Sequence, residues 1–420
     1  MLESITILGS SSGRNAGDAA LLAGIMASID KVHGRRLRYE IPSLRPEFIW
    51  RSYENKSRPV SMLPWAGTIG MLGIPTIRSL LRTDMTLIYD AMLFDKKLYN
   101  PLFNYMSTAR LLLPYAKKAG KILGCYNIGA GPVTTPQGRN MLRDIGNMMD
   151  FITVRDQDSI DLLREVGVTN PNMLLTADAA ISVKAASDER IDKIMSTFAL
   201  PTGEEILGIN VNSYLNTWAG TGQAALTPDS FADVYAQGLV KALETIKAPV
   251  LFVCTQHSDI AITSKVMERL PNNIKCALFT NVEYGHHDIK GVLGRLSMLC
   301  AMRLHANILA SSAYTPTIAL AFQKKVTSYY KRLGLEDCVM SFNDFSAERL
   351  TQHLLTGWSN RSRIRQALVQ HIPYLMEEAD KAAEVVKCVG NGESAGAVIE
   401  RIKASSGSSN MQASVCAVNQ

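Results

Sequence analysis

The stretch from Met298 to Gly334 constrains the fold more than any other part of the chain. An apolar run over 298–302 stops at Arg303-Leu-His305, a helical segment of small residues follows, and a second apolar run from Pro316 stops at Phe322-Gln-Lys-Lys325. This pattern predicts strand, helix, strand and loop, which is the unit of a parallel α/β sheet. Both polar clusters therefore fall at the carboxyl ends of strands, where open α/β sheets bind ligands.

His305 and Lys325 are candidates for one shared site. They lie twenty residues apart, the length of one βα repeat, so neighbouring parallel strands would bring both to the same edge of the sheet. A histidine and a lysine that face one crevice suit a phosphorylated or carboxylated substrate. The alternative for each residue is structural: His305 packs at a helix start, and Lys325 is a solvated surface side chain.

The first turn of the chain offers a second candidate site. Residues 4–9 are an apolar strand that breaks into a small, glycine-containing turn before a segment with helical spacing. Such a turn presents backbone N–H groups and the positive end of a helix to an anion, and Asp18 is the predicted N-cap. The turn does not match G-x-G-x-x-G, so it does not indicate a dinucleotide site. A purely structural role is equally compatible, because any α/β repeat can require such a turn.

Polar residues follow other predicted strands in the same way. A buried strand over 121–127 leads to Gly129-Ala-Gly131-Pro132, which permits a tight turn and a close approach of the backbone to a ligand. The strand over 151–154 ends at Arg155. Arg155 thus takes the same kind of position as His305.

The length and the change of pattern along the chain indicate two domains. A chain of 420 residues exceeds the usual size of one domain. Residues 182–203 are polar and end in Pro-Thr-Gly, which is typical of a boundary, and an α/β series lies on each side. We therefore expect an α/β fold with two domains, C-terminal helices and a disordered tail. Their ranges, in that order, are 1–184, 204–375, 376–403 and 404–420.

Charge and cysteine content narrow the classes of partner. The formal net charge of +6, from 44 basic and 38 acidic residues, is spread along the chain. It is too dispersed for nucleic-acid binding but suits anionic small molecules. The seven cysteines form no CxxC pair, so neither a zinc site nor a disulfide framework is indicated, and a reducing cytoplasm is expected. No other ligand cluster suggests a metal site.

One apolar tract suggests contact with a membrane. Residues 62–75 are apolar but are interrupted by glycines and prolines and are too short to cross a bilayer. With Trp65 and the following Arg78 and Arg82, the tract could lie on a membrane surface; the alternative is an ordinary buried loop and helix. The N-terminal segment has the acidic Glu3 and no basic region, so we expect a strand and not a signal peptide. The expected location is the cytoplasm, with peripheral contact at the inner membrane face.

Taken in order, these motifs resemble those of the polysaccharide pyruvyl transferase family over residues 5–334. Each motif is weak alone, but their order and spacing together are specific. They are Asn15-Ala-Gly17-Asp18, Gly129-Ala-Gly131-Pro132, Val154-Arg155-Asp156 with Ser159 and Gly167, Asp178, Arg303-Leu-His305-Ala306, and Pro316 leading to Phe322-Gln-Lys-Lys325. The chain departs from the family twice. Tyr89-Asp90-Ala91 replaces a run of glycines on the acceptor side, and Phe322 replaces a tyrosine, which loses a hydroxyl but keeps the ring.

The resemblance implies a GT-B-like fold, with two Rossmann-type domains that face a central cleft. It also implies transfer of the pyruvyl group of phosphoenolpyruvate to a sugar as a cyclic ketal. The acceptor would be an exopolysaccharide, a surface glycan or a lipid-linked precursor, bound by the N-terminal domain, while the C-terminal domain binds the donor. Phosphoenolpyruvate would be a co-substrate, with no cofactor and no metal.

The resemblance also assigns roles to residues. By motif, the catalytic residues are His305, Arg155 and Lys325; Lys325 matches the family lysine better than Lys324, because Val326 follows it. The residues implied to bind substrate are Asn15, Gly17, Asp18, Gly129, Gly131, Pro132 and Arg303.

Two other functions stay open on the sequence. A GT-B glycosyltransferase that uses a nucleotide sugar would have the same crevice and basic strand ends, although the usual donor-side glutamate and ribose-binding motif are not apparent. A non-catalytic scaffold in polysaccharide assembly is the other. The intact set of Arg155, His305 and Lys325 argues against a scaffold, whereas the altered Tyr89-Asp90-Ala91 segment leaves this alternative open.

Overall fold

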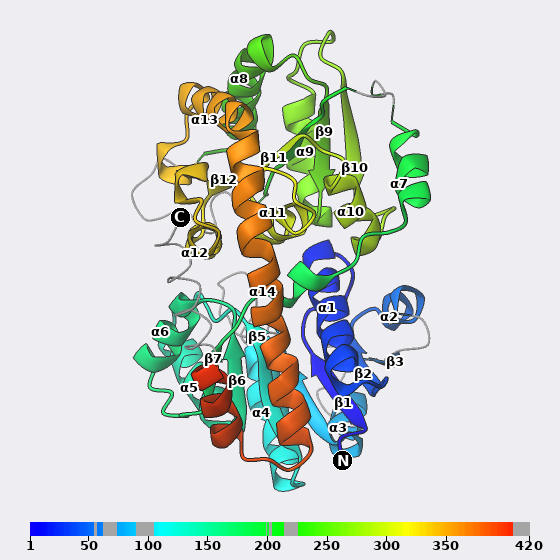
Figure 1. The fold of residues 1–420 in the computed structure, drawn as a ribbon, viewed down its shortest axis with the longest axis vertical. Coiled ribbons are helices and arrows are strands. Elements are labelled where there is room, and N and C mark those ends of the chain that lie inside the picture. Colours follow the sequence, from blue (N-terminus) through cyan, green and yellow to red (C-terminus); the bar gives the residue numbers. More distant parts are fainter. Residues whose placement is uncertain are drawn as a thin grey trace, which may run out of the picture. The chain divides into compact units, whose positions relative to one another are not determined.

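The computed structural model of this chain describes two units, each built on one parallel sheet (Figure 1). Unit 1 comprises Met1–Gly13, Leu21–Ala179 and the chain from Leu375 onward, and unit 2 comprises Arg14–Ala20 and Ala180–Tyr374. The expected α/β fold with two Rossmann-type domains is therefore confirmed. The described residues are 1–53, 57–61, 74–89, 105–198, 200, 204–213 and 226–405.

The sheet of unit 1 has seven parallel strands in the order β3-β2-β1-β4-β5-β6-β7. The order reverses between β1 and β4, as it does in Rossmann folds. The strands are short apolar runs bounded by polar or glycine-containing turns, in agreement with the sequence pattern. They are β1 (Ser4–Leu8), β2 (Arg38–Ser43), β3 (Ser57–Ser61), β4 (Met85–Ile88), β5 (Ile122–Ile128), β6 (Phe151–Val154) and β7 (Met173–Leu175).

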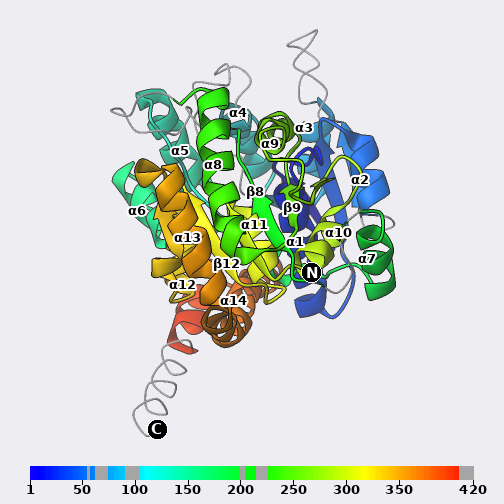
Figure 2. The same cartoon turned by 90° about the horizontal axis from the view of Figure 1, so that it is seen from above.

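Helices cover both faces of this sheet. Its helices are α1 (Ala16–His33), α2 (Pro46–Ser52), α3 (Ile74–Arg82), α4 (Tyr105–Lys118), α5 (Pro136–Met148), α6 (Gln157–Glu165), the end of α14 (Arg361–Gly390) and a last helix from Ala395. Helix α3 packs on α4, α4 on α5 and α5 on α6, and this layer shares a core with Leu8, Leu113 and Cys125. Helices α1 and α14, joined by a Ser28–Asp380 hydrogen bond, form the other layer (Figure 2). Successive side chains of each strand point to opposite faces of the sheet, so every strand contributes to the core beneath each helix layer.

Unit 2 repeats the same topology with six parallel strands in the order β10-β9-β8-β11-β12-β13. The order again reverses, here between β8 and β11. The strands are β8 (Leu207–Asn210), β9 (Val250–Cys254), β10 (Cys276–Thr280), β11 (Met298–Ala301), β12 (Thr317–Ala321) and β13 (Val339–Ser341).

The helices of unit 2 also form two layers. They are α7 (Asp188–Met195), α8 (Pro228–Ile246), α9 (Ile260–Met267), α10 (His286–Leu293), α11 (Leu304–Ser311), α12 (Lys324–Arg332), α13 (Ala347–Ser359) and the start of α14, with 3-10 turns at Ala179–Ser182, His257–Asp259, Glu336–Cys338 and Phe342–Asp344. Helix α8 packs against α9 and α13, while α11 packs against α10 and α12. Both sheets are therefore buried on two sides, which explains their continuous apolar runs.

The two units exchange segments of chain. Arg14–Ala20, at the start of α1, belongs to unit 2, although the rest of α1 belongs to unit 1. At the other end, α14 is a single helix whose residues from Leu375 onward belong to unit 1. The expected ranges 1–184 and 204–375 follow the chain without these exchanges and place the C-terminal helices apart from both domains.

Several features of the sequence fall at the limits of the described chain. Among the described residues, no helix combines the length and the apolar character that a membrane crossing needs. The tract over 62–75 lies outside the described residues up to position 73, and so do Asp90, Ala91 and the tail from residue 406.

Candidate functional site

Unit 2 gathers polar groups at the carboxyl ends of its central strands. Asn210 ends β8, and its Oδ1 accepts a hydrogen bond from the Arg303 N–H group at 3.0 Å. Its Nδ2 donates to the Val253 carbonyl of β9 at 2.8 Å. Asn210 therefore ties together the ends of β8, β9 and β11, at the point where the strand order reverses and where this class of sheet binds ligands.

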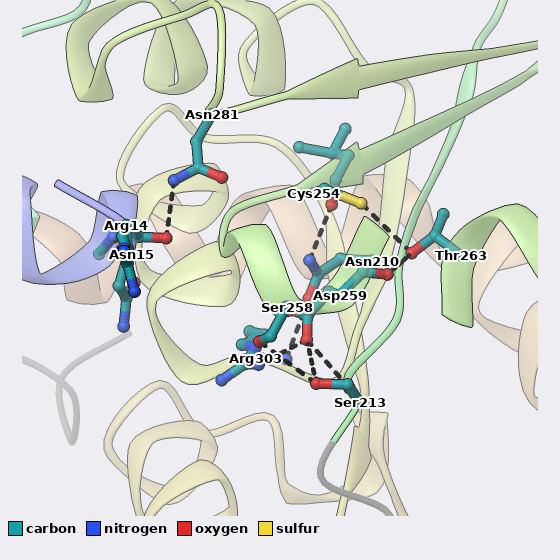
Figure 3. A network of polar contacts seen from close by, with 12 residues as sticks. Arg14, Asn15, Asn210, Ser213, Cys254, Ser258, Asp259, Thr263, Asn281 and Arg303 are labelled. Atoms are coloured by element: carbon teal, nitrogen blue, oxygen red, sulfur yellow. Dashed lines mark hydrogen bonds and ion pairs between the residues drawn. The ribbon is translucent and has the colours of Figure 1, made fainter. Parts of the chain in front are cut away.

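A buried ion pair lies at the centre of this group (Figure 3). Nε and Nη2 of Arg303 donate to Oδ2 and Oδ1 of Asp259 at 2.7 and 2.6 Å, and the Asp259 side chain is 0% exposed. Ser213 donates to Oδ1 through both its N–H and its hydroxyl at 2.9 Å. Two parallel charge-assisted hydrogen bonds hold the plane of a guanidinium. The pair therefore fixes Arg303, the N-cap of α11, two positions before His305.

Asp259 is not among the residues predicted from the sequence to form the site. The residue follows β9 in Thr255-Gln-His257-Ser-Asp259, a polar run at a strand end of the same kind that selected Arg155 and His305. Its place at a strand end is the one sequence feature that marks it as a candidate. Nothing local distinguishes Asp259 from its polar neighbours, because its partner lies 44 residues further along the chain.

The segment around Asn15 lies against the ends of β9 and β10 in unit 2. The Ala16 N–H group donates to the Thr255 carbonyl at 2.8 Å. The Arg14 carbonyl accepts from the His257 N–H group at 3.1 Å and from Asn281 Nδ2 at 3.0 Å (Figure 3). These contacts place Arg14 and Ala16 beside the polar groups at the strand ends of unit 2.

Gly17 packs directly against the imidazole of His305. A β-carbon at position 17 would lie 2.3 Å from His305 Nδ1, so only glycine leaves room for this ring. The Oδ1 atom of Asn15 accepts from the Gly17 N–H group at 2.9 Å, and Asn15 is therefore the cap of α1. The prediction that Asp18 is the N-cap is wrong, because Asp18 is the third residue of α1 and is buried. A carboxylate there still suits the positive end of the helix.

His305 and Lys325 occupy matching positions after neighbouring strands. Strands β11 and β12 pair in parallel, and each leads into a helix of which the candidate is the second residue. The predicted strand, helix and strand are confirmed, but Lys325 lies in the first turn of α12 and not in a loop. The N-cap side chains, Arg303 and Gln323, make no capping hydrogen bond to their helices. The positive end of each helix dipole favours an anion at these two positions.

Arg155 belongs to unit 1, where it forms a second buried ion pair. It directly follows β6, and its Nη1 donates to Asp178 Oδ2 at 2.7 Å. The two side chains are only 5% and 4% exposed. Asp156 Oδ2 lies 3.8 Å from Nε. An anion that approaches Arg155 or Arg303 thus meets a guanidinium whose charge is already shared with a carboxylate.

Gly129, the first residue of the Gly129-Ala-Gly131-Pro132 turn, packs against Arg155. A β-carbon at Gly129 would lie 2.5 Å from Nη2 of Arg155, and Gly131 has a φ of +84°. The Ala130 N–H group donates to the Ser159 hydroxyl at 2.9 Å. The sequence predicted a close approach of this backbone to a ligand, and the group that approaches it in the structure is the Arg155 guanidinium.

Replacing Asp178 with asparagine is expected to lower the free energy of unfolding by about 3 kcal/mol, because it removes the nearer carboxylate from a buried arginine. Urea unfolding followed by circular dichroism measures the loss. The control is Glu165→Gln, which removes a surface pair with Arg139 whose side chains are 64% and 36% exposed. That pair should contribute less than about 1 kcal/mol. Equal losses in the two variants would contradict a structural role for the Asp178 pair.

The other side chains near Asp259 and Arg303 limit the chemistry that the unit 2 site can perform. Burial raises the pKa of Cys254 to about 11, and its thiol donates to Thr263 Oγ1 at 3.2 Å, so it is not a ready nucleophile. Among the described residues, no group of three or more histidine, cysteine, aspartate or glutamate side chains is placed to hold a metal ion. His305 offers an imidazole that can transfer a proton, and Lys325 offers a compact positive charge.

Comparison with known proteins identifies the family. The model of the family described as polysaccharide pyruvyl transferase matches residues 15–323. The chain belongs to the polysaccharide pyruvyl transferase family. The match begins at Asn15, includes Arg155 and His305, and ends two residues before Lys325. No curated protein sequence matches this family member.

Solved structures show where else this fold occurs. The family member is similar to Anabaena HepE in complex with UDP and glucose, with a TM-score of 0.59 and 11% identity over 94% of this chain and 100% of that one. It is similar to a Rickettsia africae glycosyltransferase, with a TM-score of 0.59 and 12% identity over 93% and 100%. It is also similar to the Neisseria meningitidis UDP-GlcNAc 2-epimerase bound to UDP-GlcNAc, with a TM-score of 0.56 and 10% identity over 92% and 98%. These likenesses show the fold alone, and the fold of this pyruvyl transferase family member is GT-B-like.

Proposed function

We propose that this protein transfers the pyruvyl group of phosphoenolpyruvate to a sugar as a cyclic ketal. The acceptor is a sugar of an exopolysaccharide or surface glycan, or of its lipid-linked precursor. Membership of the family supports the reaction class. The observation that carries the proposal is the matched placement of His305 and Lys325 in the first turns of α11 and α12, after neighbouring parallel strands.

The reaction requires a proton donor and a site for phosphate. C3 of phosphoenolpyruvate gains a proton, so that C2 becomes electrophilic and is attacked by a sugar hydroxyl. The bond from C2 to the phosphate oxygen breaks, and a second hydroxyl closes the ring on C2. The two hydroxyl protons end on C3 and on the departing phosphate. The chemistry therefore needs a group that titrates near neutral pH and a cation beside the leaving group.

His305 is the general acid and base in this proposal. Lys325 neutralises the charge that grows on the departing phosphate. Arg155 holds the carboxylate or the phosphate of the donor, while Arg303, fixed by Asp259, completes the substrate-binding edge of unit 2. In each unit a glycine lies against one of these residues: Gly129 packs on Arg155 in unit 1, and Gly17 packs on His305 in unit 2. The scheme uses phosphoenolpyruvate as co-substrate and needs neither cofactor nor metal.

Lys325→Ala is expected to abolish most of the thermal stabilisation that phosphoenolpyruvate gives. A ligand at 100 times its Kd stabilises the folded state by about 2.7 kcal/mol, which corresponds to a rise in Tm of roughly 5 °C for a domain of this size. The matched control is Lys324→Ala, because Lys324 is the exposed neighbour of the half-buried Lys325. Lys324→Ala should keep the full rise.

The ligands tested in the same experiment distinguish the alternatives. Phosphate and pyruvate, offered separately, should give smaller rises in Tm than phosphoenolpyruvate. A rise with UDP-glucose or GDP-mannose and none with phosphoenolpyruvate would favour a glycosyltransferase. No rise with any of these ligands would favour a non-catalytic scaffold. An Arg155→Ala/Lys325→Ala double variant that keeps the full phosphoenolpyruvate effect would contradict the site assignment.

A further inference from the structure

Helices α3 and α4 of unit 1 carry a surface that is both apolar and basic. The two helices pack side by side, and neither contains an acidic residue. Among the side chains of these helices whose burial the structure describes, four large hydrophobic ones are exposed: Ile74 (38%), Leu81 (42%), Leu111 (66%) and Tyr115 (53%). An exposed apolar group of this kind, with basic residues around it, is typical of a binding surface.

The exposed side chains form one stripe on each helix. On α3, Ile74, Arg78 and Leu81 recur at intervals of four and three residues. Residues at these spacings lie on the same helical face. The inward faces are already filled, since Leu80 and Leu113 are 0% exposed and belong to the core beneath these helices. Figure 2 places α3 and α4 next to each other, on the side of the sheet away from α14.

The exposed stripe on α4 has the same residue spacing as the stripe on α3. Leu111, Tyr115 and Lys118 recur at intervals of four and three residues, and all three side chains are exposed. Because α3 and α4 pack side by side, we name these two exposed stripes together the α3–α4 surface. Each stripe includes a basic residue within it, Arg78 on α3 and Lys118 on α4.

Arginines outnumber the carboxylates with which they pair around α3 and α4. Glu40 is shared by Arg82 at 2.6 Å and Arg58 at 4.0 Å, so one carboxylate faces two arginines. Asp144 is likewise shared by two arginines, Arg110 at 2.8 Å and Arg143 at 3.3 Å. In the part of the chain that the structure describes, no acidic side chain pairs with Arg78 or Lys118. The partner that fits the α3–α4 surface is therefore anionic.

We propose that the α3–α4 surface binds an anionic lipid membrane. Leucine, isoleucine and tyrosine side chains enter the boundary between headgroups and acyl chains, while the basic residues around them attract acidic lipids. A second copy of the chain fits less well, because a two-fold interface would place this basic surface on itself. Binding to nucleic-acid phosphates would explain the basic residues but not the four exposed apolar side chains. The surface does not depend on the proposed reaction.

Vesicle co-sedimentation of the full chain tests the proposal. Binding to phosphatidylcholine vesicles that contain phosphatidylglycerol should exceed binding to phosphatidylcholine alone, and it should fall as salt is raised. The apolar variant, Leu111→Ser/Tyr115→Ser, and the charge variant, Arg78→Glu/Lys118→Glu, should each lower the partition coefficient about tenfold or more. All four positions are exposed, so the variants should keep the circular dichroism and the Tm of the wild type.

The control variant is Val369→Ser/Arg365→Glu, which changes an exposed apolar and an exposed basic residue on α14. It should bind vesicles like the wild type. Failure of the wild type to prefer anionic vesicles, or equal binding by all variants, would overturn the proposal. A change from dimer to monomer in the α3–α4 variants, without an effect on vesicles, would also overturn it and would indicate self-association. The vesicle assay contains no phosphoenolpyruvate, so a negative result in it would not contradict the proposed reaction.

Discussion

Replacing His305 with glutamine is expected to lower kcat by roughly a hundredfold to ten-thousandfold, the range that a positioned general acid or base contributes. Glutamine keeps a similar length and a hydrogen-bonding end but cannot transfer a proton. His305 is half-buried in the first turn of α11, and its removal leaves the Asp259–Arg303 pair in place. The variant should therefore fold and still show the rise in Tm with phosphoenolpyruvate, while turnover is lost.

The measurement combines a test in vitro with one in cells. Phosphate release from phosphoenolpyruvate in the presence of acceptor gives kcat. Mass spectrometry of the surface glycan gives the cellular result: a deletion strain should lack ketal-linked pyruvate, and the His305→Gln variant should not restore it. His371→Gln is the control, because His371 is a half-buried histidine of the same unit, on α14. Turnover near the wild-type value in a folded His305 variant would remove this residue from the mechanism.

Gly17→Ala is expected to lower kcat by roughly a hundredfold while leaving the chain folded. The added β-carbon would lie 2.3 Å from His305 Nδ1, so either the imidazole or the start of α1 must move. A displacement of about 1 Å in a catalytic group is enough for a loss of this size. Alanine is also the better helix former, by about 1 kcal/mol, which offsets part of the strain. The variant thus separates the positioning of His305 from the stability of the protein.

The matched control for this variant is Gly285→Ala. Gly285 precedes α10 with a φ of −78°, and an added β-carbon there meets nothing within 4 Å. Its kcat should equal that of the wild type. Urea unfolding should show both variants to be stable, and KM for phosphoenolpyruvate should change less than kcat in Gly17→Ala. Full activity of Gly17→Ala would show that the close contact with His305 does not position the ring for reaction.

The sequence alone predicts most of the strands that support the site. A parallel strand that is covered on both faces needs apolar side chains throughout. The runs over β4, β6, β9, β11 and β12 are therefore continuous and end sharply at polar residues, which makes each strand recognisable in the sequence. The same runs show where each strand ends, and hence they identify Arg155, His305 and the residues after β9. The family follows from the order of these strand-end motifs.

Strands β2 and β3 are not predicted from the sequence, because they are not continuous apolar runs. Strand β2 contains Glu40 and Pro42, and β3 contains Arg58 and Pro59. Proline in a short run argues against a strand unless the strand lies at an edge, which is where β3 lies. The helix over Asp188–Met195 lies within the predicted polar boundary, and its sequence is mostly polar because only two of its side chains, Ile191 and Ile194, are buried.

Only the tertiary structure decides which strand ends meet and which charges pair. Local periodicity depends on neighbours three or four residues away, and the sequence therefore determines it. Asp259 and Arg303 are 44 residues apart, and Gly17 reaches His305 only because Arg14–Ala20 joins unit 2 instead of the unit that holds the rest of α1. These contacts depend on strand order and on an exchange of chain between units, which leave no local signature. The sequence thus identifies the reactive residue types, whereas the fold decides which of them are fixed by buried carboxylates and which lie beside the helix starts.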